Sequence, residues 1–338
     1  MKQFIGMLCC LCFWVTIPTH AQDCGLEIDT EAGDFALLSS GLPNNIRAEA
    51  DTTADRLGQI PPNGFFVLLS EGVCSEGVTW FEVQTPTIIG WTIGSSDNTV
   101  FFETYSGTLA GSRDVGFILP DGLASGATVE TIEATERFPS YRLITFEDFV
   151  EVSGDNFVEA RIRIFDATVF ENLSGQAADG ATFAFPLIAD LIASEDDLSA
   201  FATNEIPEFA LGSAQIAFAS PMYIPNYDGM GYRYIASYAQ NFVSVTNDFL
   251  EYRYQGYSSD NAYFIDASFP IDAPESDFPI YDAVAGANDS DAGFARYADY
   301  SAEVREYLET FSDDEFTPNL RTLDALLSSL LVIEPETE

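Results

Sequence analysis

The chain carries few of the side chains on which most enzymes rely. His20 is its only histidine and Lys2 its only lysine, and both lie within the first 21 residues. If those residues are removed, no Ser-His-Asp triad, Cys-His pair, histidine-ligated zinc or Schiff-base lysine can form. We therefore predict no catalytic residue of these classes, no metal site and no cofactor.

Carboxylates are the one abundant chemical group. The sequence has 54 acidic and 13 basic residues, a net charge of −41. Pairs such as Asp196/Asp197 and Asp313/Asp314 are the residue types that glycoside hydrolysis needs, but at this density adjacent acids arise by chance. A carboxylate-dependent hydrolase stays open as an alternative. Such a polyanion repels nucleic acid and anionic membrane surfaces, so neither is an expected partner.

Tyrosines recur at alternate positions in two segments. Tyr232, Tyr234 and Tyr238 share one face of a predicted strand, and Tyr252 and Tyr254 share a face of another. Such rows bind sugars or peptides in some proteins, and in many others they pack against neighbouring strands. We favour the packing role.

The first 21 residues have the pattern of a secretion signal. Lys2 gives the positive start, an apolar run extends from Phe4 to Ile17, and Thr19 and Ala21 are the small residues before a cleavage site. We predict cleavage after Ala21 and export to the periplasm or the exterior. The run is shorter than a membrane span, so the mature form has no predicted membrane anchor.

Two cysteines remain after cleavage. Cys9, Cys10 and Cys12 belong to the signal, which leaves Cys24 and Cys74. A pair of cysteines in an exported chain favours a disulfide, and closing this loop stabilises by about 4 kcal/mol in the loop-entropy account.

Residues 22–105 are predicted to form a small β-barrel with an N-terminal extension, because short apolar strands alternate with turns about every 10 positions in the barrel part. Within them, residues 41–105 contain several motifs at regular spacing. They are Pro43-Asn44-Asn45-Ile46-Arg47, Leu57-Gly58-Gln59-Ile60-Pro61, Gly64-Phe65-Phe66-Val67-Leu68-Leu69, Thr79-Trp80-Phe81-Glu82-Val83 and Ile89-Gly90-Trp91-Thr92.

These motifs resemble those of the bacterial SH3-like (SH3b) family, with Glu49-Ala50 and Thr85-Pro86-Thr87 as departures. The resemblance implies a domain that binds peptides or peptidoglycan outside the cytoplasm. The ligand-binding residues that we predict from it are Trp80, Trp91 and Phe66, although most large aromatic residues of so small a barrel must pack in its core. The implied partner is a cell-wall peptide or an envelope protein.

A Gly/Ser-rich stretch, residues 106–113, is predicted to be a linker. It leads into a second domain, residues 114–338, whose elements follow from apolar periodicity and turn residues. The predicted strands are Val115 to Pro120, Arg142 to Glu147, Val158 to Phe165, Tyr232 to Val245, Phe249 to Tyr257 and Ala262 to Phe269. The predicted helices are Leu187 to Ala193 with Pro186 in its first turn, one around Phe294 to Phe311, and one capped by Thr317-Pro318.

The predicted fold is therefore mixed: a small all-β SH3-like barrel followed by an α+β domain with a mostly antiparallel sheet. The second domain is similar to the PsbP/Mog1-type sandwich and to an uncharacterised region that follows SH3b domains in secreted bacterial proteins. The predicted function is binding without catalysis. The alternatives are the hydrolase and a structural component of the cell envelope.

Overall fold

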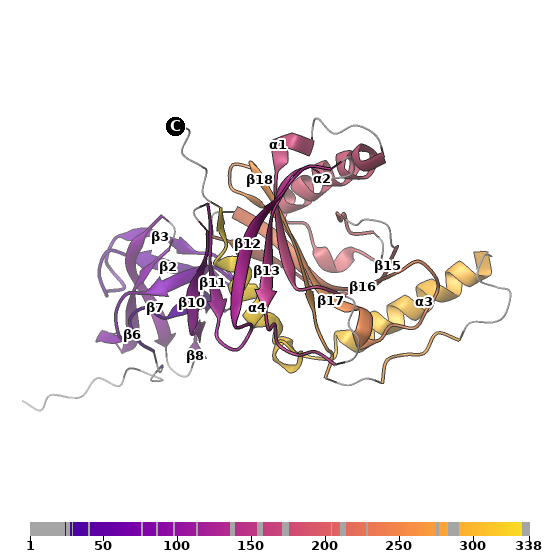
Figure 1. Cartoon of the computed structure of the whole chain (residues 1–338). Coiled ribbons are helices and arrows are strands. Elements are labelled where there is room, and N and C mark those ends of the chain that lie inside the picture. The colour runs from indigo at the N-terminus through magenta and orange to yellow at the C-terminus, as the bar shows by residue number, and fades with distance from the viewer. Residues whose placement is uncertain are drawn as a thin grey trace, which may run out of the picture.

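The computed structural model in Figure 1 describes Cys24, Ile28 and most of residues 30–332. The exceptions within that range are residues 40, 76, 86, 97–98, 113, 136–138, 154–157, 171–175, 204, 210–213, 228, 275–276 and 283–290. The predicted signal peptide, residues 1–21, lies outside the described residues.

The N-terminal part is an antiparallel sheet of short strands, in the order β3-β2-β7-β6-β4-β1-β9 with β5 on β6 and β8 on β7. Phe66 and Phe81 both pack edge-on against Phe102 in its core, with ring centroids 5.3 Å apart in each pair. The strands are β1 (Phe35–Leu38), β2 (Asn44–Arg47), β3 (Arg56–Ile60), β4 (Phe65–Leu68), β5 (Val73–Ser75), β6 (Val78–Gln84), β7 (Ile89–Ser96), β8 (Thr99–Val100) and β9 (Phe102–Tyr105).

The stretch that we expected to be a linker contains a strand. β10 (Gly107–Gly111) pairs with β11 (Val115–Pro120), and β19 (Leu331–Val332) completes a three-stranded sheet. Gly111 ends β10 with φ +132°, where a Cβ would lie 2.0 Å from the Val115 carbonyl oxygen. The glycines thus permit a tight antiparallel turn between β10 and β11 in place of a loose connection.

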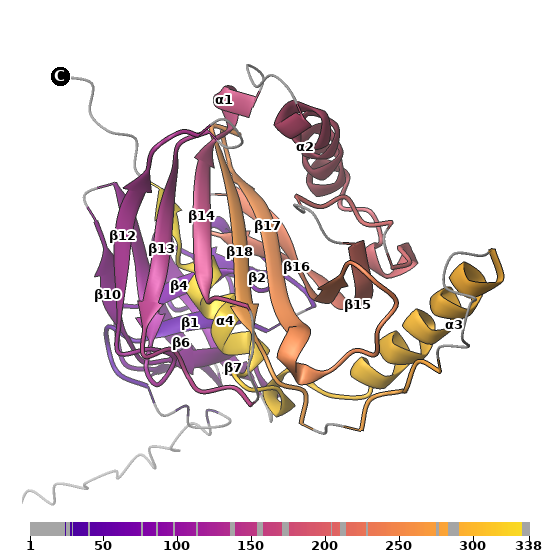
Figure 2. The ribbon, with the colours of Figure 1, turned by 45° about the vertical axis from the view of Figure 1, so that its right-hand side comes forward.

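A seven-stranded antiparallel sheet forms the centre of the molecule, in the order β12-β13-β14-β18-β17-β16-β15 (Figure 2). Both of its faces are buried over most of its width. The alternation of apolar and charged residues in β14 did not predict a second buried face. The strands are β12 (Gly126–Ile132), β13 (Tyr141–Glu147), β14 (Arg161–Asp166), β15 (Ala214–Asn226), β16 (Gly229–Ala239), β17 (Leu250–Ser258) and β18 (Tyr263–Pro270).

Helices cover the two faces of this sheet. Apolar residues of α2 pack on one face, and those of α3 and α4 pack on the other, together with β11. The helices are α1 (Ala167–Phe170), α2 (Gln176–Ser194), α3 (Asp291–Leu308) and α4 (Leu320–Ser328), with short 3-10 turns η1 (Leu198–Ala200), η2 (Asn247–Phe249) and η3 (Asp313–Glu315). This mostly β arrangement of antiparallel sheets with helices confirms the mixed α+β class.

Two helix boundaries differ from the prediction. Helix α2 begins at Gln176, so Pro186 lies in its interior and not in its first turn. Helix α4 is capped by Asn319, whose side chain accepts a hydrogen bond from the Arg321 N–H, and not by Thr317.

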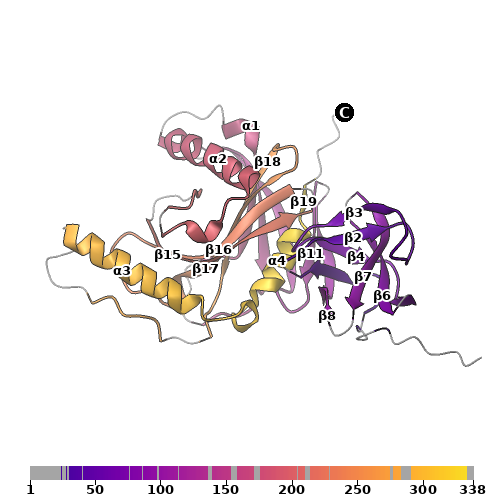
Figure 3. The ribbon, with the colours of Figure 1, turned by 180° about the vertical axis from the view of Figure 1, so that it is seen from behind.

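Helix α4 lies between the N-terminal sheet and the seven-stranded sheet (Figure 3). Arg321 on this helix donates a hydrogen bond to the side-chain oxygen of Asn63 at 3.0 Å, and its guanidinium also faces Glu103 and Asp324. Asn63 is 5% exposed, and its amide donates to the Tyr223 carbonyl oxygen on β15. The N-terminal sheet is therefore fixed to the rest of the molecule by buried polar contacts.

Candidate functional site

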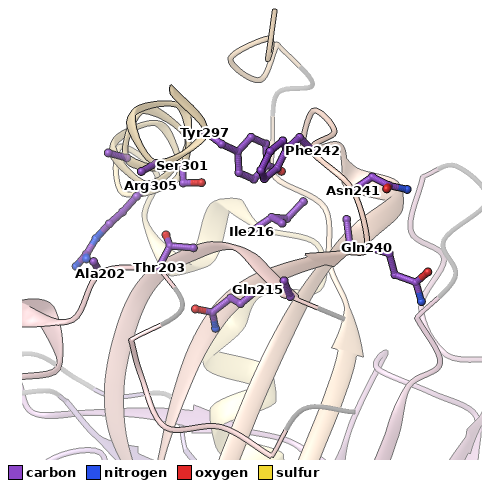
Figure 4. A pocket seen from close by; sticks show the side chains of 14 residues that line it. Ala202, Thr203, Gln215, Ile216, Gln240, Asn241, Phe242, Tyr297, Ser301 and Arg305 are labelled. Atoms are coloured by element: carbon purple, nitrogen blue, oxygen red, sulfur yellow. The ribbon is translucent and has the colours of Figure 1, made fainter. Parts of the chain in front are cut away.

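A cavity of about 580 Å³ lies where α3 approaches the start of β15 and the end of β16 (Figure 4). Small side chains on all of these segments leave the space open. On the helix these are Ala298, Ser301 and Ala302, whose spacing of three and four residues puts them on one face. Ala214 and Ala239 are their counterparts on the strands.

One wall of the cavity is aromatic. The rings of Phe242 and Tyr297 lie 4.5 Å apart between centroids, side by side in Figure 4. The Tyr297 hydroxyl donates a hydrogen bond to the Val243 carbonyl oxygen, which fixes the ring in place. Ile216 points toward this pair. This wall offers a rigid apolar surface to a ligand.

The polar groups of the lining are amides, hydroxyls and one guanidinium. Gln240 and Asn241 lie exposed at the rim, and Thr203 and Ser301 contribute hydroxyls. The Arg305 guanidinium donates to the carbonyl oxygens of Phe201 at 2.6 Å and Ser199 at 3.1 Å, and its Nε donates to Glu309. These bonds hold the 199–203 segment against α3. A complete list of lining residues is Ala202, Thr203, Ala214, Gln215, Ile216, Ala239, Gln240, Asn241, Phe242, Tyr297, Ala298, Ser301, Ala302 and Arg305.

Among the described residues, the cavity lining contains no carboxylate. This composition is informative because the sequence has 54 acidic residues and acids occupy most of its surface charge. Neither acid pair singled out in the sequence reaches the cavity. Asp313 forms an ion pair with Arg233 at 2.7 Å, and Asp197 caps η1.

Gln215 connects the cavity wall to a buried polar cluster on the α2 face of the sheet. Its amide donates to the carboxylate of Glu208 at 3.1 Å, and the hydroxyls of Tyr234 and Tyr238 donate to the same carboxylate at 3.0 and 2.5 Å. Burial raises the pKa of Glu208, and these tyrosine hydrogen bonds and Arg253 only partly oppose that effect. Tyr232, which donates to the Pro207 carbonyl oxygen, completes this end of the cluster.

The cluster continues across β17, β18 and β14 as a row of ion pairs. Asp266, with no exposed surface, accepts hydrogen bonds from Arg163 at 2.5 Å and from Arg253 at 2.7 Å. Burial alone would raise the pKa of Asp266, but Arg163 and Arg253 outweigh it and lower the pKa. Glu251 adds a second carboxylate beside Arg253, and Ser268 donates to it at 2.6 Å.

The three predicted ligand-binding residues of the N-terminal sheet are placed differently from one another. Trp80 and Phe66 are fully buried, and Phe66 belongs to the apolar core. Trp91 is half-buried on β7. Alternation along this strand puts Ile89, Trp91 and Ile93 on one side, where Ile89 is 55% exposed. Of the three, only Trp91 presents a ring to a ligand in this structure.

Cys24 and Cys74 form the predicted disulfide, with their Cα atoms 5.6 Å apart. The bond attaches the leading segment to β5, and the Thr79 hydroxyl adds a hydrogen bond to the Cys24 carbonyl oxygen.

The tyrosine rows are packed inside the molecule. Tyr232 and Tyr234 lie in the apolar cluster under α2, and Tyr252 and Tyr254 lie in the cluster on the other face. All four are fully buried. Within the described residues they therefore offer no open platform to a sugar or peptide.

The described part of the chain contains no group of three or more histidine, cysteine, aspartate or glutamate side chains placed to hold a metal ion. None of its helices has both the length and the apolarity to cross a membrane.

Sequence reasoning missed the cavity, because its walls come from segments about 100 residues apart and consist of small side chains. The sequence did indicate the buried polar cluster. Glu159, Arg161 and Arg163 alternate with apolar residues, which places charged groups on one strand face.

No protein-family model matches the sequence, and comparisons with curated proteins and with solved structures gave no match either.

Proposed function

We propose that the chain is an exported binding protein that acts without catalysis and holds its ligand in the cavity between α3 and β15. The observation that carries this proposal is a large cavity without a carboxylate in a strongly acidic chain. Glycoside hydrolysis needs two carboxyl groups at the reacting bond, so the lining favours binding over that reaction.

The lining also indicates the ligand. Phe242 and Tyr297 suit an apolar or aromatic group, and Gln240 and Asn241 carry both donors and acceptors. A peptide segment has this combination, since its amide groups match side-chain amides and its side chains match the apolar wall. The negative charge of the whole molecule disfavours acidic ligands. The proposed ligand is therefore a neutral peptide segment with apolar side chains, as found among envelope peptides.

Filling the cavity tests this proposal. We expect capped tripeptide amides with an aliphatic or aromatic central residue to bind the mature chain saturably in isothermal titration calorimetry. Ala302→Phe should weaken this binding by about tenfold or more, since the new ring occupies the cavity. Ala295→Phe is the matched control, because Ala295 is exposed on the same helix outside the lining. Equal binding by both variants, or no saturable binding by the unchanged chain, would contradict the proposal.

The SH3b resemblance supplies a second candidate, in which the N-terminal sheet binds envelope peptide or peptidoglycan. Its support is the order of short antiparallel strands and the side of β7 that carries Ile89, Trp91 and Ile93. We expect Trp91→Ala to reduce binding of the whole chain to purified peptidoglycan in a pull-down. Leu42→Ala, at an 88% exposed leucine, should have no effect. Retention of binding by Trp91→Ala would rule out this surface.

The second part of the chain is proposed to be a PsbP/Mog1-type sandwich. The central antiparallel sheet with helices on both faces supports that assignment. In this arrangement the binding cavity lies at the β15 edge of the sheet.

A further inference from the structure

The α2 face of the central sheet is covered unequally. Over β15 to β18 its residues are buried beneath α2 and the 199–209 segment. On β12 the side chains of Thr128 and Glu130 are exposed, and on β13 Thr145 is half-buried. Figure 2 shows β12 and β13 at the end of the sheet away from α2. The polar cluster therefore extends from the half of the face that α2 covers, β15 to β18, toward the open half, β12 and β13.

Arg161 lies at the boundary between these halves. In the strand register it is directly opposite Thr145 on β13 and Ser268 on β18, and Ser268 is opposite Arg253 on β17. Directly opposed residues point to the same face, so these four side chains form one row across the sheet. The Cα atoms of Arg161 and Arg253 are two strand spacings apart, about 10 Å.

The guanidinium of Arg161 has unused hydrogen-bonding capacity. Within the described part of the chain it makes no hydrogen bond, and its Nε is buried without a partner. Its one ion-pair contact is a 3.9 Å approach to Glu159, which is 86% exposed. The Nε of Arg253, a residue that is 6% exposed, also lacks a partner. Buried donors without acceptors are rare in folded proteins, and a bound ion is one explanation for such a donor.

Three arginines gather in this row, although the chain is strongly negative. Arg161, Arg163 and Arg253 lie beside the carboxylates of Asp266, Glu251 and Glu159. Burial lowers the pKa of Arg161, and the positive charges of Arg163 and Arg253 lower it further. An anion placed at Arg161 would relieve this repulsion and supply the missing acceptors.

We propose that Arg161 and the row beside it form a binding site for a small oxyanion, a phosphate or a carboxylate group, on the open half of this sheet face. The fork of guanidinium N–H groups on Arg161 matches two oxygens of such a group, and the hydroxyl of Thr145 is the adjacent donor. This site is distinct from the α3 cavity, whose lining contains none of these residues.

The test is titration of inorganic phosphate, and separately of sodium acetate, into the whole chain at constant ionic strength. We expect saturable 1:1 binding of at least one of the two anions by calorimetry. Arg161→Gln should weaken it by about tenfold or more. Arg56→Gln removes an exposed arginine of β3 and should leave the affinity unchanged. Ala302→Phe should also leave it unchanged, which separates this site from the proposed peptide cavity.

A second variant distinguishes loss of anion binding from loss of folding. Arg161→Lys keeps the positive charge and loses the fork, so it should bind several-fold more weakly while its circular dichroism spectrum stays native. Phosphate and acetate differ in shape, and the one that binds more tightly identifies a tetrahedral or a planar group. The proposal is overturned if neither anion binds saturably, or if a folded Arg161→Gln or Arg161→Lys variant binds as tightly as the unchanged chain.

Discussion

Asp266 is fully buried and Glu208 is half-buried, and their carboxylates have different electrostatic surroundings. Asp266 has two arginine partners, which lower its pKa. Glu208 is surrounded by hydroxyl and amide donors, and burial raises its pKa. The difference arises because a neutral donor offsets less of the cost of burying a charge than an arginine does.

Glu208 therefore predicts a specific pH dependence of stability. Its pKa in the folded state is above the ordinary value of 4.5, so the folded state binds this proton more tightly than the unfolded state. The stability contributed by the protonated form is present at low pH and is lost as the pH rises through the folded pKa. Glu208→Gln should remove this loss, because glutamine stays neutral.

The measurement is urea unfolding of both proteins between about pH 5 and pH 8, a range that lies above the ordinary pKa of glutamate. The free energy of unfolding should fall less steeply with pH in Glu208→Gln than in the unchanged chain. Glu130→Gln, at an exposed position on β12, should leave the slope unchanged. Parallel slopes for the unchanged chain and Glu208→Gln would show that the carboxyl is not perturbed.

At the scale of elements, α4 holds the two sheets together. Its leucines at 320, 323, 326 and 327 are fully buried in the larger apolar cluster, while Arg321 reaches the N-terminal sheet. The helix is short, nine residues, so tertiary packing and not intrinsic propensity stabilises it.

Truncating one of these leucines should be costly. Leu326→Ala removes a fully buried side chain from between the sheets, and we expect a loss of about 2–5 kcal/mol in the free energy of unfolding. Leu42→Ala, the same substitution at an 88% exposed site, should change it by less than about 0.5 kcal/mol. Urea titrations followed by circular dichroism give both values. A similar small effect in the two variants would mean that α4 does not hold the sheets together.

Elements with regular patterns were predictable, and the irregular ones were not. The strands β11, β13, β17 and β18 and the helices α3 and α4 follow apolar periodicity and turn residues. Strand β15 was missed because Pro221 and Pro225 interrupt it, and an edge strand with bulges tolerates both. The start of α2 was misplaced because Pro186 suggested a first turn. The disulfide was predictable from the cysteine count, whereas the cavity depends on distant small residues that carry no local signal.

At the scale of the whole molecule, charge is the dominant feature. Among the described residues, arginines such as Arg163, Arg233, Arg253 and Arg321 form ion pairs with a small share of the acids, several of them buried. Most of the 54 carboxylates are therefore left to repel one another. Salt screens this repulsion, with a Debye length of about 8 Å at 0.15 M and about 3 Å at 1 M.

Stability should consequently rise with salt. We expect the melting temperature to increase between dilute buffer and about 1 M sodium chloride, because screening favours the compact state of a self-repelling chain. A variant with Asp121, Glu130 and Glu133 changed to asparagine or glutamine should respond less, since these exposed acids contribute to the repulsion. Differential scanning calorimetry of both proteins measures the melting temperature at each salt concentration. A melting temperature that stays flat or falls would mean that the acids are too dispersed to matter.

The three-stranded sheet joins two parts of the chain that are far apart in sequence. β19 pairs with β11, so Leu331 and Val332 lie beside Gly116 and Val115, and the Ser329 hydroxyl accepts the Ile118 N–H across 211 residues. A contact of such long range forms only after the intervening chain is available, and closing so large a loop is slow. One edge of β11 is paired by β10, whereas its other edge stays open until β19 is available. If the chain is exported unfolded, as we propose, the three-stranded sheet can close only after both β11 and β19 have crossed the membrane.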